Sequence, residues 1–314
     1  MLDIVLVNWN SGIQLENVIS SIAAHHDELI KSVIVVDNAS TDNSMYRIES
    51  GLQAFPFDLK IICNSENHGF GFACNQGAAI GTSEFVLFLN PDTLLFSQSL
   101  LVPINFLQKS ENFDVGIVGI QLIDEKGVVA RSCANFPTVL ILMAQASGLN
   151  RLPLFHKLTQ AMVKWPHDST RTVDQVIGAF FLVRRSVLQM LHGFDEKFFV
   201  YFEEVDLALR ACQMGFRSVF LVEAQAFHAG GGTSHQVKAR RLFYFLRSRL
   251  LYAFKHFSWI GAVGVLLATL LVEPFSRSCL ALLRLSWPNL KETWAAYSLL
   301  WLWLPQWIFK GVTR

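Results

Sequence analysis

Residues 32–43 read Ser-Val-Ile-Val-Val-Asp-Asn-Ala-Ser-Thr-Asp-Asn, a mostly apolar run that leads directly into polar residues typical of a helix start. The polar residues at 40–43 are the types that accept hydrogen bonds from the free N–H groups of a first helical turn. A short apolar run bounded in this way predicts a buried strand over Ser32–Val36, ending at Asp37, and a helix after it.

The same alternation of strand and helix signals continues over the first 130 residues. Further strands are expected at residues 2–8, 59–63 and 85–89, and helices at 11–24 and 69–80. Short apolar strands separated by helices are typical of a mostly parallel sheet with helices on both faces. Ligands of such α/β sheets bind beyond the carboxyl ends of the strands. The polar residues expected at these ends are Asn8, Asp37, Asn64 and Asn90.

The pattern changes beyond residue 115. The sequence predicts a hairpin of Val115–Ile123 and Val128–Cys133, a strand over Val176–Val183, a helix over Glu203–Met214 and a strand over Ser218–Val222. Residues 135–172 show no regular pattern, and we predict irregular structure there.

Charge divides the chain into two parts. Residues 1–235 hold 15 Lys and Arg against 23 Asp and Glu, whereas residues 236–314 hold 11 against 2. Six of the eight Trp residues lie beyond position 258. The chain is 52% apolar and 16% charged, which excludes a disordered protein and indicates membrane contact. We therefore predict a catalytic domain at 1–235 and a membrane-associating helical region at 236–314.

The C-terminal region contains one basic and two apolar segments. Residues 236–255 hold six Lys and Arg and no acid, with apolar residues at helical spacing, which is typical of a helix on a membrane surface. The uncharged runs at 257–272 and 293–309 are shorter than the roughly 20 residues that a spanning helix needs. We expect interfacial or re-entrant helices, because Trp residues lie beside Lys and Arg. The alternative is a buried pair of core helices.

The cysteines and the N-terminus favour a cytoplasmic catalytic domain. The five cysteines form no CxxC pair, which fits a reducing compartment. The first residues have no basic segment before the first apolar strand, so we predict no signal peptide. The expected location is the cytoplasmic face of the inner membrane, with peripheral or monotopic attachment.

Four positions carry candidate chemistry. Asp37 at a strand end can bind a nucleobase or ribose, or can act as an ordinary cap. Asp92, in Asn90-Pro91-Asp92, can hold a hard divalent cation, although this tripeptide also occurs in turns. Glu203, Glu204 and Asp206 begin a helix after an aromatic run; they can cap the helix or provide a base. His228 precedes three glycines, which suggests a loop that closes over a ligand, although a lone histidine is more often structural.

These motifs occur in an order typical of one enzyme family. They are Val-Asn-Trp-Asn-Ser at 7–11, Val-Asp-Asn-Ala-Ser-Thr-Asp at 36–42, Asn-Ser-Glu-Asn-His-Gly-Phe-Gly at 64–71, Leu-Asn-Pro-Asp at 89–92, Gly-Phe-Asp-Glu at 193–196, Phe-Phe-Val-Tyr-Phe-Glu-Glu-Val-Asp-Leu at 198–207 and His-Ala-Gly-Gly-Gly-Thr-Ser at 228–234. Over about residues 1–255 the chain resembles a family 2 inverting glycosyltransferase of the GT-A fold, in the branch of bacterial rhamnosyltransferases.

The resemblance implies roles for individual residues. Glu204 matches the catalytic base, with Glu203 and Asp206 as positioning residues. Asp92 matches a metal-binding acid and His228 a further metal or diphosphate ligand, so Mg²⁺ or Mn²⁺ is the expected cofactor. The remaining matches are donor-binding residues: Asn8, Asp37, Asn67, Gly69, Gly71, Asn75 and Asn90.

The resemblance also implies the reaction and the partners. A sugar, with rhamnose favoured, would pass from a nucleoside diphosphate such as dTDP to a hydroxyl of a lipid-linked saccharide in cell-surface polysaccharide synthesis. No nucleic-acid partner is expected. Two other hypotheses stay open: a nucleotidyltransferase on a related sheet, and a non-catalytic membrane-anchored binding module. Residues 8–12 carry no Lys or Arg, which disfavours the first; the acidic cluster disfavours the second.

Overall fold

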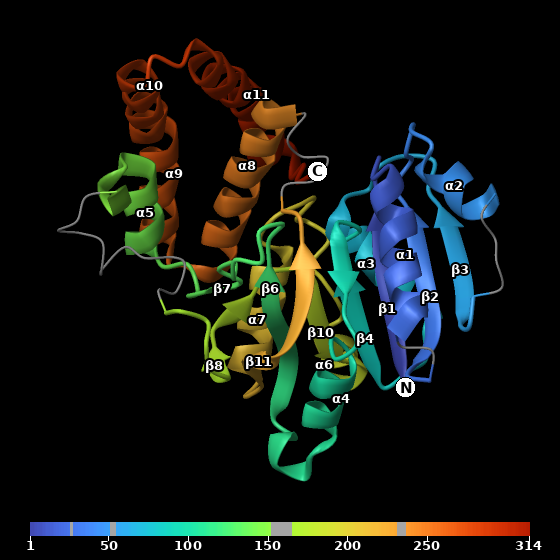
Figure 1. The fold of residues 1–314 in the computed structure, drawn as a ribbon. Coiled ribbons are helices and arrows are strands. Elements are labelled where there is room, and N and C mark those ends of the chain that lie inside the picture. Colours follow the sequence, from blue (N-terminus) through green and yellow to red (C-terminus); the bar gives the residue numbers. More distant parts are fainter. Residues whose placement is uncertain (26–27, 51–54, 152–164, 231–236) are drawn as a thin grey trace. The chain divides into compact units, whose positions relative to one another are not determined.

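The computed structural model describes residues 1–25, 28–50, 55–151, 165–230 and 237–314 (Figure 1). These residues form two compact units. Unit 1 comprises Met1–Ala134, Trp165–Glu196 and Glu203–Thr233, and unit 2 comprises Asn135–Lys164, Lys197–Phe202 and Ser234–Arg314.

Unit 1 is built on one mixed sheet, whose strand order is β3-β2-β1-β4-β10-β6-β11-β5, with β8 beside β11. Strands β1 to β4 run parallel, β6 and β11 run parallel to each other, and β10 is antiparallel between β4 and β6. The strands are β1 (Leu2–Asn8), β2 (Ile30–Asp37), β3 (Asp58–Cys63), β4 (Phe85–Leu89), β5 (Thr93–Leu95), β6 (Val115–Ile123), β8 (Arg171–Val173), β10 (Phe180–Arg184) and β11 (Arg217–His228). The predicted mostly parallel α/β sheet is confirmed.

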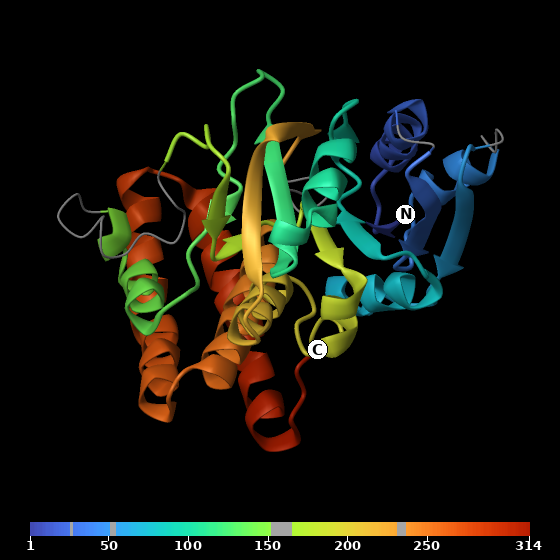
Figure 2. The ribbon, with the colours of Figure 1, turned by 90° about the horizontal axis from the view of Figure 1, so that it is seen from below.

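Helices cover both faces of this sheet, as Figure 2 shows for α1 and α4 on one side and α3 and α7 on the other. Alternate β1 side chains face opposite layers. Leu2, Ile4 and Leu6 join the main apolar core with α1 and α4, while Val5 faces α3 at Gly77. The helices of unit 1 are α1 (Ile13–His25), α2 (Ser44–Ser50), α3 (Phe70–Ile80), α4 (Leu101–Gln108), the 3₁₀ turn η1 (Ser110–Asn112), α6 (Arg185–Met190) and α7 (Glu203–Gln213).

Three local predictions differ from the structure. The expected hairpin is reduced to one bridge between Ile123 and Val129, and β7 (Cys133–Ala134) pairs instead with β9 (Gln175–Val176). The strand expected at 176–183 is broken by a turn, so β9 and β10 belong to different sheets. Residues 135–172 are not wholly irregular, because the helix α5 (Val139–Ser147) is capped by Thr138 and ended by Gly148; residues 152–164 lie outside the described part.

All the regular elements among the described residues of unit 2 are helices or helical turns. Its elements are α5, the 3₁₀ turn η2 (Leu149–Arg151), α8 (Lys238–His256), α9 (Trp259–Leu267), the π segment η5 (Ala268–Val272), α10 (Glu273–Leu283) and α11 (Trp287–Lys310). The uncharged run at 257–272 stops at Glu273, but the helix does not end there. Helix continues from Trp259 to Leu283 through the wider π turn, which precedes a proline that cannot donate a backbone hydrogen bond.

Helix α8 is also more buried than the sequence predicts. Every residue from Leu246 to Ala253 is buried, including Arg247 and Arg249. Arg247 lies over the rings of Phe199 and Tyr244, and Arg249 forms an ion pair with Glu273. The expected membrane-facing basic helix is therefore wrong for its C-terminal half, because its arginines have partners inside unit 2.

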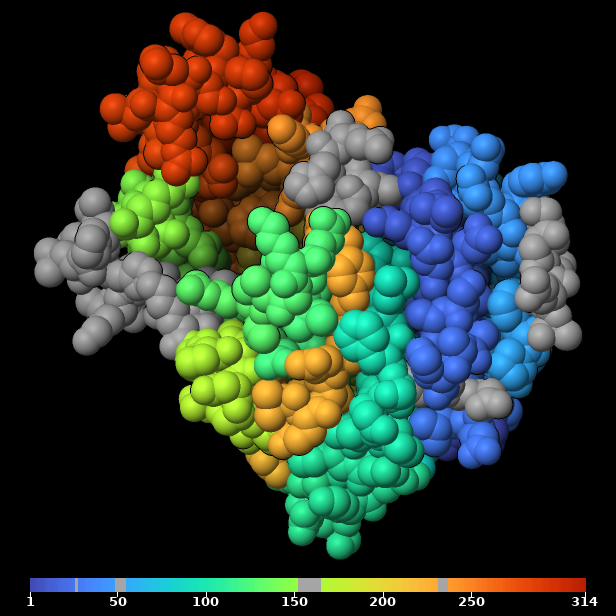
Figure 3. Space-filling model, in the orientation of Figure 1, coloured from blue at the N-terminus to red at the C-terminus, as the bar shows by residue number. Residues whose placement is uncertain are grey.

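Large apolar side chains of unit 2 are exposed on α5, α9, α10 and α11 and in the segments that join them. Figure 3 shows part of the surface of the C-terminal region in orange and red. Ile260, Leu283, Leu285 and Phe309 are each more than 80% exposed. Within the described residues, the stretch Trp259–Leu283 is long and apolar enough to cross a membrane by length and composition, although a third of its most apolar window is buried inside the protein.

Candidate active site

The first polar cluster lies where β1 and β2 end side by side. Asn8 pairs with Asp37 in register, and its Nδ2 donates to Asp37 Oδ1 at 2.7 Å and to Ser44 Oγ at 2.8 Å. Both Asn8 and Asp37 are buried, at 0% and 6% exposure. Asn8 thus fixes the Asp37 carboxylate at the edge of the sheet, where the sequence predicts a nucleoside-binding residue.

The segment after β2 is held by a residue that sequence reasoning missed. Asn10 Oδ1 accepts hydrogen bonds from the backbone N–H groups of Thr41 and Asp42 at 2.7 and 3.3 Å, and Ser40 Oγ accepts from the Asn10 N–H. Asn10 adopts a left-handed backbone with φ of 54°. The sequence feature that could have indicated this role is the pair of asparagines, Asn8 and Asn10, on either side of Trp9 at the end of the first strand.

The predicted donor loop wraps the start of α3. Asn67 Oδ1 accepts from the Gly69 N–H at 2.9 Å, and the Gly69 carbonyl accepts from Asn38 Nδ2 at 3.0 Å. Gly69 has a φ of 93°, which side chains rarely tolerate. Gly71 is buried in the first helical turn. This loop presents the N-terminus of α3, with its partial positive charge, near the strand ends.

The side-chain amide of Asn75 forms its hydrogen bonds with a second loop, at residues 193–196. Its Nδ2 donates to the Phe194 carbonyl at 2.9 Å and to Glu196 Oε1 at 3.1 Å, and its Oδ1 accepts from the Phe194 N–H. A Cβ at Gly193 would lie 2.4 Å from Asn75 Oδ1, so this loop needs glycine there. The amide therefore positions the Gly-Phe-Asp-Glu motif.

Asp92 and His228 meet beyond the sheet. Thr93 of β5 pairs with His228 of β11, which places His228 Nε2 3.3 Å from Asp92 Oδ1. Their side chains are only 10% and 15% exposed, and the Ala229 N–H donates to the Asp92 carbonyl. The sequence predicts both as metal or diphosphate ligands, and tertiary structure brings them together. The glycines at 231 and 232, expected to form a closing loop, lie outside the described residues.

A short turn before β10 links this pair to the acidic cluster. The Ala179 carbonyl accepts hydrogen bonds from the Asn90 N–H at 3.1 Å and from Thr93 Oγ1 at 3.4 Å. On its other side, a Cβ at Gly178 would lie 4.0 Å from the carboxyl carbon of Glu204. The strand-end turn at Asn90–Asp92 and the carboxyl group of Glu204 therefore flank the same two residues.

Glu203 and Glu204 form an acidic pair at the start of α7, in which Glu203 is buried and Glu204 is half-buried. Each has an Oε2 atom inaccessible to solvent and without a hydrogen-bond partner among the described residues. Burial raises the pKa of both, and the charge of Glu204 raises the pKa of Glu203 further. Burial and both carboxylates also raise the pKa of the Cys74 thiol on α3. The two carboxyl groups therefore do not ionise independently, and both hold a proton to higher pH than an ordinary glutamate.

Asp206, the third acid, has an internal partner. Its Oδ2 accepts from Arg210 Nε at 2.8 Å, and the two residues stand four positions apart on the same helix. The same guanidinium donates to the carbonyls of Leu191 and Gly193, so Asp206 and Arg210 anchor the loop that Asn75 also holds. Asp206 is completely buried.

The backbone is strained immediately before the acidic pair. Tyr201 and Phe202 have φ of 68° and 69°, a left-handed conformation that is uncommon for bulky residues. Such strain costs roughly 1–3 kcal/mol per residue and clusters at functional sites.

The residues present fit a divalent cation bound together with a diphosphate. A carboxylate and an imidazole suit Mn²⁺, and Mg²⁺ sites commonly use one or two protein ligands with substrate phosphates and water. No cluster of three or more His, Cys, Asp or Glu that could hold a metal occurs within the described ranges. Asp92 and His228 would therefore supply two ligands to the cation, and the diphosphate and water would supply the others.

Solved structures define the class of this fold. The chain is similar to the Pyrobaculum calidifontis mannosyltransferase PcManGT in complex with GDP-Man and Mn²⁺, with a TM-score of 0.56 and 18% identity, covering 99% of this chain and 81% of that one. It is also similar to Staphylococcus aureus TarS, residues 1–349, with a TM-score of 0.53 and 16% identity over 94% and 78% of the two chains. The fold is therefore the GT-A fold of glycosyltransferases.

Sequence comparison identifies the family. The profile of glycosyl transferase family 2 matches residues 3–191, and the chain belongs to this family of glycosyltransferases. It is 25% identical to the N-acetylglucosaminyl-diphospho-decaprenol L-rhamnosyltransferase of Mycobacterium tuberculosis, covering 82% of this chain and 86% of the relative. It is 24% identical to the rhamnosyltransferase WbbL of Escherichia coli K12, over 72% and 88%. The resemblance predicted from the motifs is confirmed.

Proposed function

We propose that the chain is an inverting, metal-dependent glycosyltransferase that moves a sugar, with rhamnose favoured, from a dTDP donor to a lipid-linked saccharide. The observation that carries this proposal is the turn at Gly178–Ala179: the Ala179 carbonyl accepts a hydrogen bond from the Asn90 N–H, and a Cβ placed at Gly178 would lie 4.0 Å from the carboxyl carbon of Glu204. A leaving-group site and a candidate base adjoin the same turn, as a single displacement requires.

Glu204 is the proposed base. Its burial raises its pKa above that of an ordinary glutamate, so its ionised form accepts a proton more strongly. It would take the proton of the acceptor hydroxyl as that oxygen attacks the anomeric carbon from the face opposite the leaving diphosphate. No covalent sugar intermediate is needed, and the configuration inverts.

The donor is held by the strand ends. Asp37, fixed by Asn8, would accept hydrogen bonds from the nucleoside, and the N-terminus of α3 with Asn67, Gly69 and Gly71 would face the diphosphate. Asp92 and His228 would hold Mg²⁺ or Mn²⁺, which when bound neutralises charge on the departing diphosphate. Asn75 and Asp206 would keep the Gly-Phe-Asp-Glu loop in place.

Two further observations support the donor, the acceptor and the location. The Mycobacterium tuberculosis relative is named for L-rhamnosyl transfer to a diphospho-decaprenol lipid, and the Escherichia coli relative is named a rhamnosyltransferase. The exposed apolar side chains of α9, α10 and α11 suit attachment to a membrane surface. We place the enzyme at the cytoplasmic face of the inner membrane, in cell-surface polysaccharide synthesis.

A panel of sugar nucleotides tests this proposal. Purified protein is incubated with each donor and with a polyprenyl-diphosphate saccharide, in EDTA, Mg²⁺ or Mn²⁺. We expect release of dTDP from dTDP-rhamnose, abolition of release in EDTA, and an inverted product by NMR. Release of pyrophosphate instead would indicate a nucleotidyltransferase, and full activity in EDTA or release from no donor would refute the proposal.

A further inference from the structure

A cavity of about 290 Å³ in unit 2 lies outside every residue assigned above. Its basic lining residues come from η2, α8, α10 and the residue that follows α10: Arg151, Lys238, Arg277 and Arg284. Among the described residues that line it, Glu292 of α11 is the single acid. A concave site with four cations and one anion is arranged to receive a negative charge.

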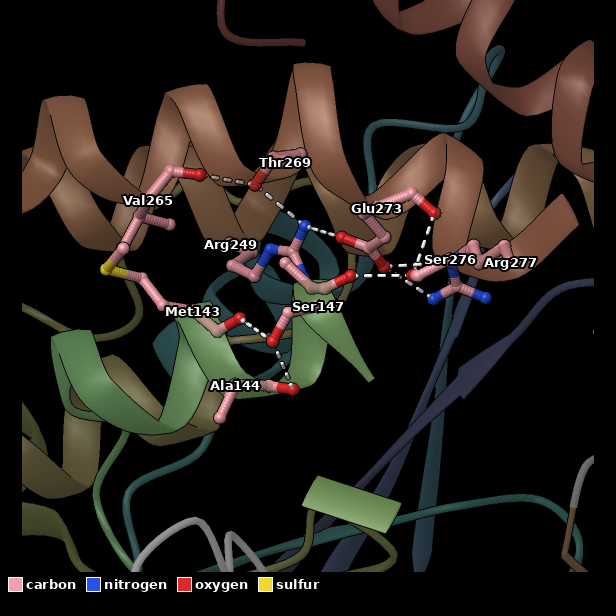
Figure 4. A network of polar contacts seen from close by, with 10 residues as sticks. Met143, Ala144, Ser147, Arg249, Val265, Thr269, Glu273, Ser276 and Arg277 are labelled. Atoms are coloured by element: carbon pink, nitrogen blue, oxygen red, sulfur yellow. Dashed lines mark hydrogen bonds and ion pairs between the residues drawn. The ribbon is translucent and has the colours of Figure 1, made fainter. Parts of the chain in front are cut away.

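One of these cations is fixed in place by a buried ion-pair network (Figure 4). Arg277 donates through Nε to Glu273 Oε1 at 2.8 Å, and Glu273 also accepts from Arg249, which in turn donates to Thr269 Oγ1. Arg249 and Glu273 are each 1% exposed. Arg249 and Arg277 share the single negative charge of Glu273, so the three side chains keep a net charge of one positive unit. Arg277 is the member of the three that lines the cavity.

The cations also repel one another. Burial lowers the pKa of Arg151, and the neighbouring charges of Arg277 and Arg284 lower it further. No salt bridge of Arg151, Lys238 or Arg284 to an acid is found in the described part of the chain. Bound anion would relieve this repulsion, and arginine forks match the oxygens of a phosphate group.

The surroundings favour an amphiphile over a free ion. Leu242 and Leu280 line the same cavity, and beside Arg284 the side chains of Leu283, Leu285 and Trp287 are 83%, 88% and 66% exposed. Exposed leucines and a tryptophan next to clustered arginines suit a hydrocarbon chain that leaves a charged headgroup. A soluble phosphate has no hydrocarbon part that could contact these apolar side chains.

We propose that this cavity binds the phosphate or diphosphate headgroup of a membrane lipid. The inference extends the proposed function, since a lipid-linked saccharide acceptor carries such a headgroup. It does not depend on the donor site, because all the lining residues belong to unit 2 and all the donor residues to unit 1.

Sedimentation of the full-length protein with vesicles tests this site. The vesicles are phosphatidylcholine alone, phosphatidylcholine with a polyprenyl diphosphate, and phosphatidylcholine with oleate at equal surface charge. We expect at least about tenfold tighter binding to the diphosphate vesicles than to the oleate vesicles, because a charge-assisted hydrogen bond is worth about 1.5–3 kcal/mol. Equal binding to the diphosphate and oleate vesicles would overturn the proposal, and this comparison is made with the wild-type protein alone.

Two double variants with equal loss of charge separate the cavity from general attraction. Arg151→Gln/Arg284→Gln removes two lining residues, whereas Arg240→Gln/Arg241→Gln removes two exposed cations of α8 that do not line it. We expect the first to lose the preference for diphosphate vesicles and the second to keep it. Equal losses in both variants would reject a specific site.

A soluble arm and a parallel assay complete the design. Inorganic pyrophosphate, added in EDTA to exclude binding through metal, should compete poorly; competition at the affinity of the lipid would overturn the lipid assignment. Nucleotide release from the sugar donor is recorded in the same samples with metal restored. If the protein shows no preference for diphosphate vesicles but still cleaves the donor, the proposed lipid site is rejected and the proposed function stands. If it prefers diphosphate vesicles but does not cleave any donor, the proposed function is rejected and the lipid site stands.

Discussion

At the scale of single residues, Glu204 is the side chain on which the proposed reaction depends. Glu204→Gln keeps the shape of the side chain and removes the proton acceptor, so we expect turnover to fall by roughly 10²–10⁴-fold with little change in donor affinity. Steady-state kinetics and donor titration measure both quantities. If Glu204→Gln kept nearly the wild-type rate while Glu203→Gln was inactive, the base would be Glu203 and the assignment to Glu204 would be wrong.

Glu203 carries a prediction about stability and pH. Its raised pKa means that the folded protein retains a proton that the unfolded chain releases above its ordinary pKa of 4.5, so the contribution of this group to stability is lost as pH rises. Glu203→Gln removes that loss. The free energy of unfolding should therefore rise relative to wild type at neutral pH and much less near pH 4, by about 1.4 kcal/mol for each unit of pKa shift.

Denaturant titration at the two pH values checks this expectation. Glu125→Gln, which neutralises an exposed acid in a turn, provides the control and should show no comparable change between the two pH values. A Glu203→Gln variant destabilised by the same amount at acidic and neutral pH would show that the carboxyl group acts through packing and not through its ionisation.

At the scale of elements, the contact of α3 with β1 sets the position of the loop that ends at Gly69. A Cβ at Gly77 would lie 2.5 Å from Val5 Cγ1, so Gly77→Ala should cost about 1–3 kcal/mol from overpacking, offset by up to about 1 kcal/mol of helix propensity. Val5→Ala in the same chain should cancel much of the cost, which a double-mutant cycle measures. Gly264→Ala meets only Met143 at 3.7 Å and should be neutral or stabilising.

At the scale of the whole molecule, the exposed apolar side chains of unit 2 carry the proposed attachment to membranes. Ile260→Gln/Phe309→Gln removes two side chains that are each 83% exposed. Burial of such a side chain is worth about 1.5–3 kcal/mol, so membrane partitioning should fall at least about tenfold. Membrane fractionation at low and high salt measures this change. The matched variant Phe113→Gln, at an exposed position of unit 1, should partition like wild type.

Much of the fold and part of the candidate site could be predicted because they depend on local order. Apolar strands that alternate with helices specify a parallel sheet, and parallel strands place their ends on one edge, which is why Asn8, Asp37 and Asn90 were expected together. The Asp206–Arg210 pair follows from helical spacing alone. The ordered motifs were sufficient to indicate the enzyme family.

Other features depend on contacts between segments far apart in the sequence, and only the tertiary structure decided them. Asp92 meets His228 because β5 pairs with β11, and Arg249 lies inside unit 2 because Glu273, on another helix, compensates its charge. The periodicity of the sequence predicts which side of a helix is polar, but it does not predict which charged side chains form ion pairs with other helices. The sequence therefore determined the class of enzyme and the edge of the sheet where the candidate site lies, while packing decided which charged side chains are buried in pairs and which remain exposed.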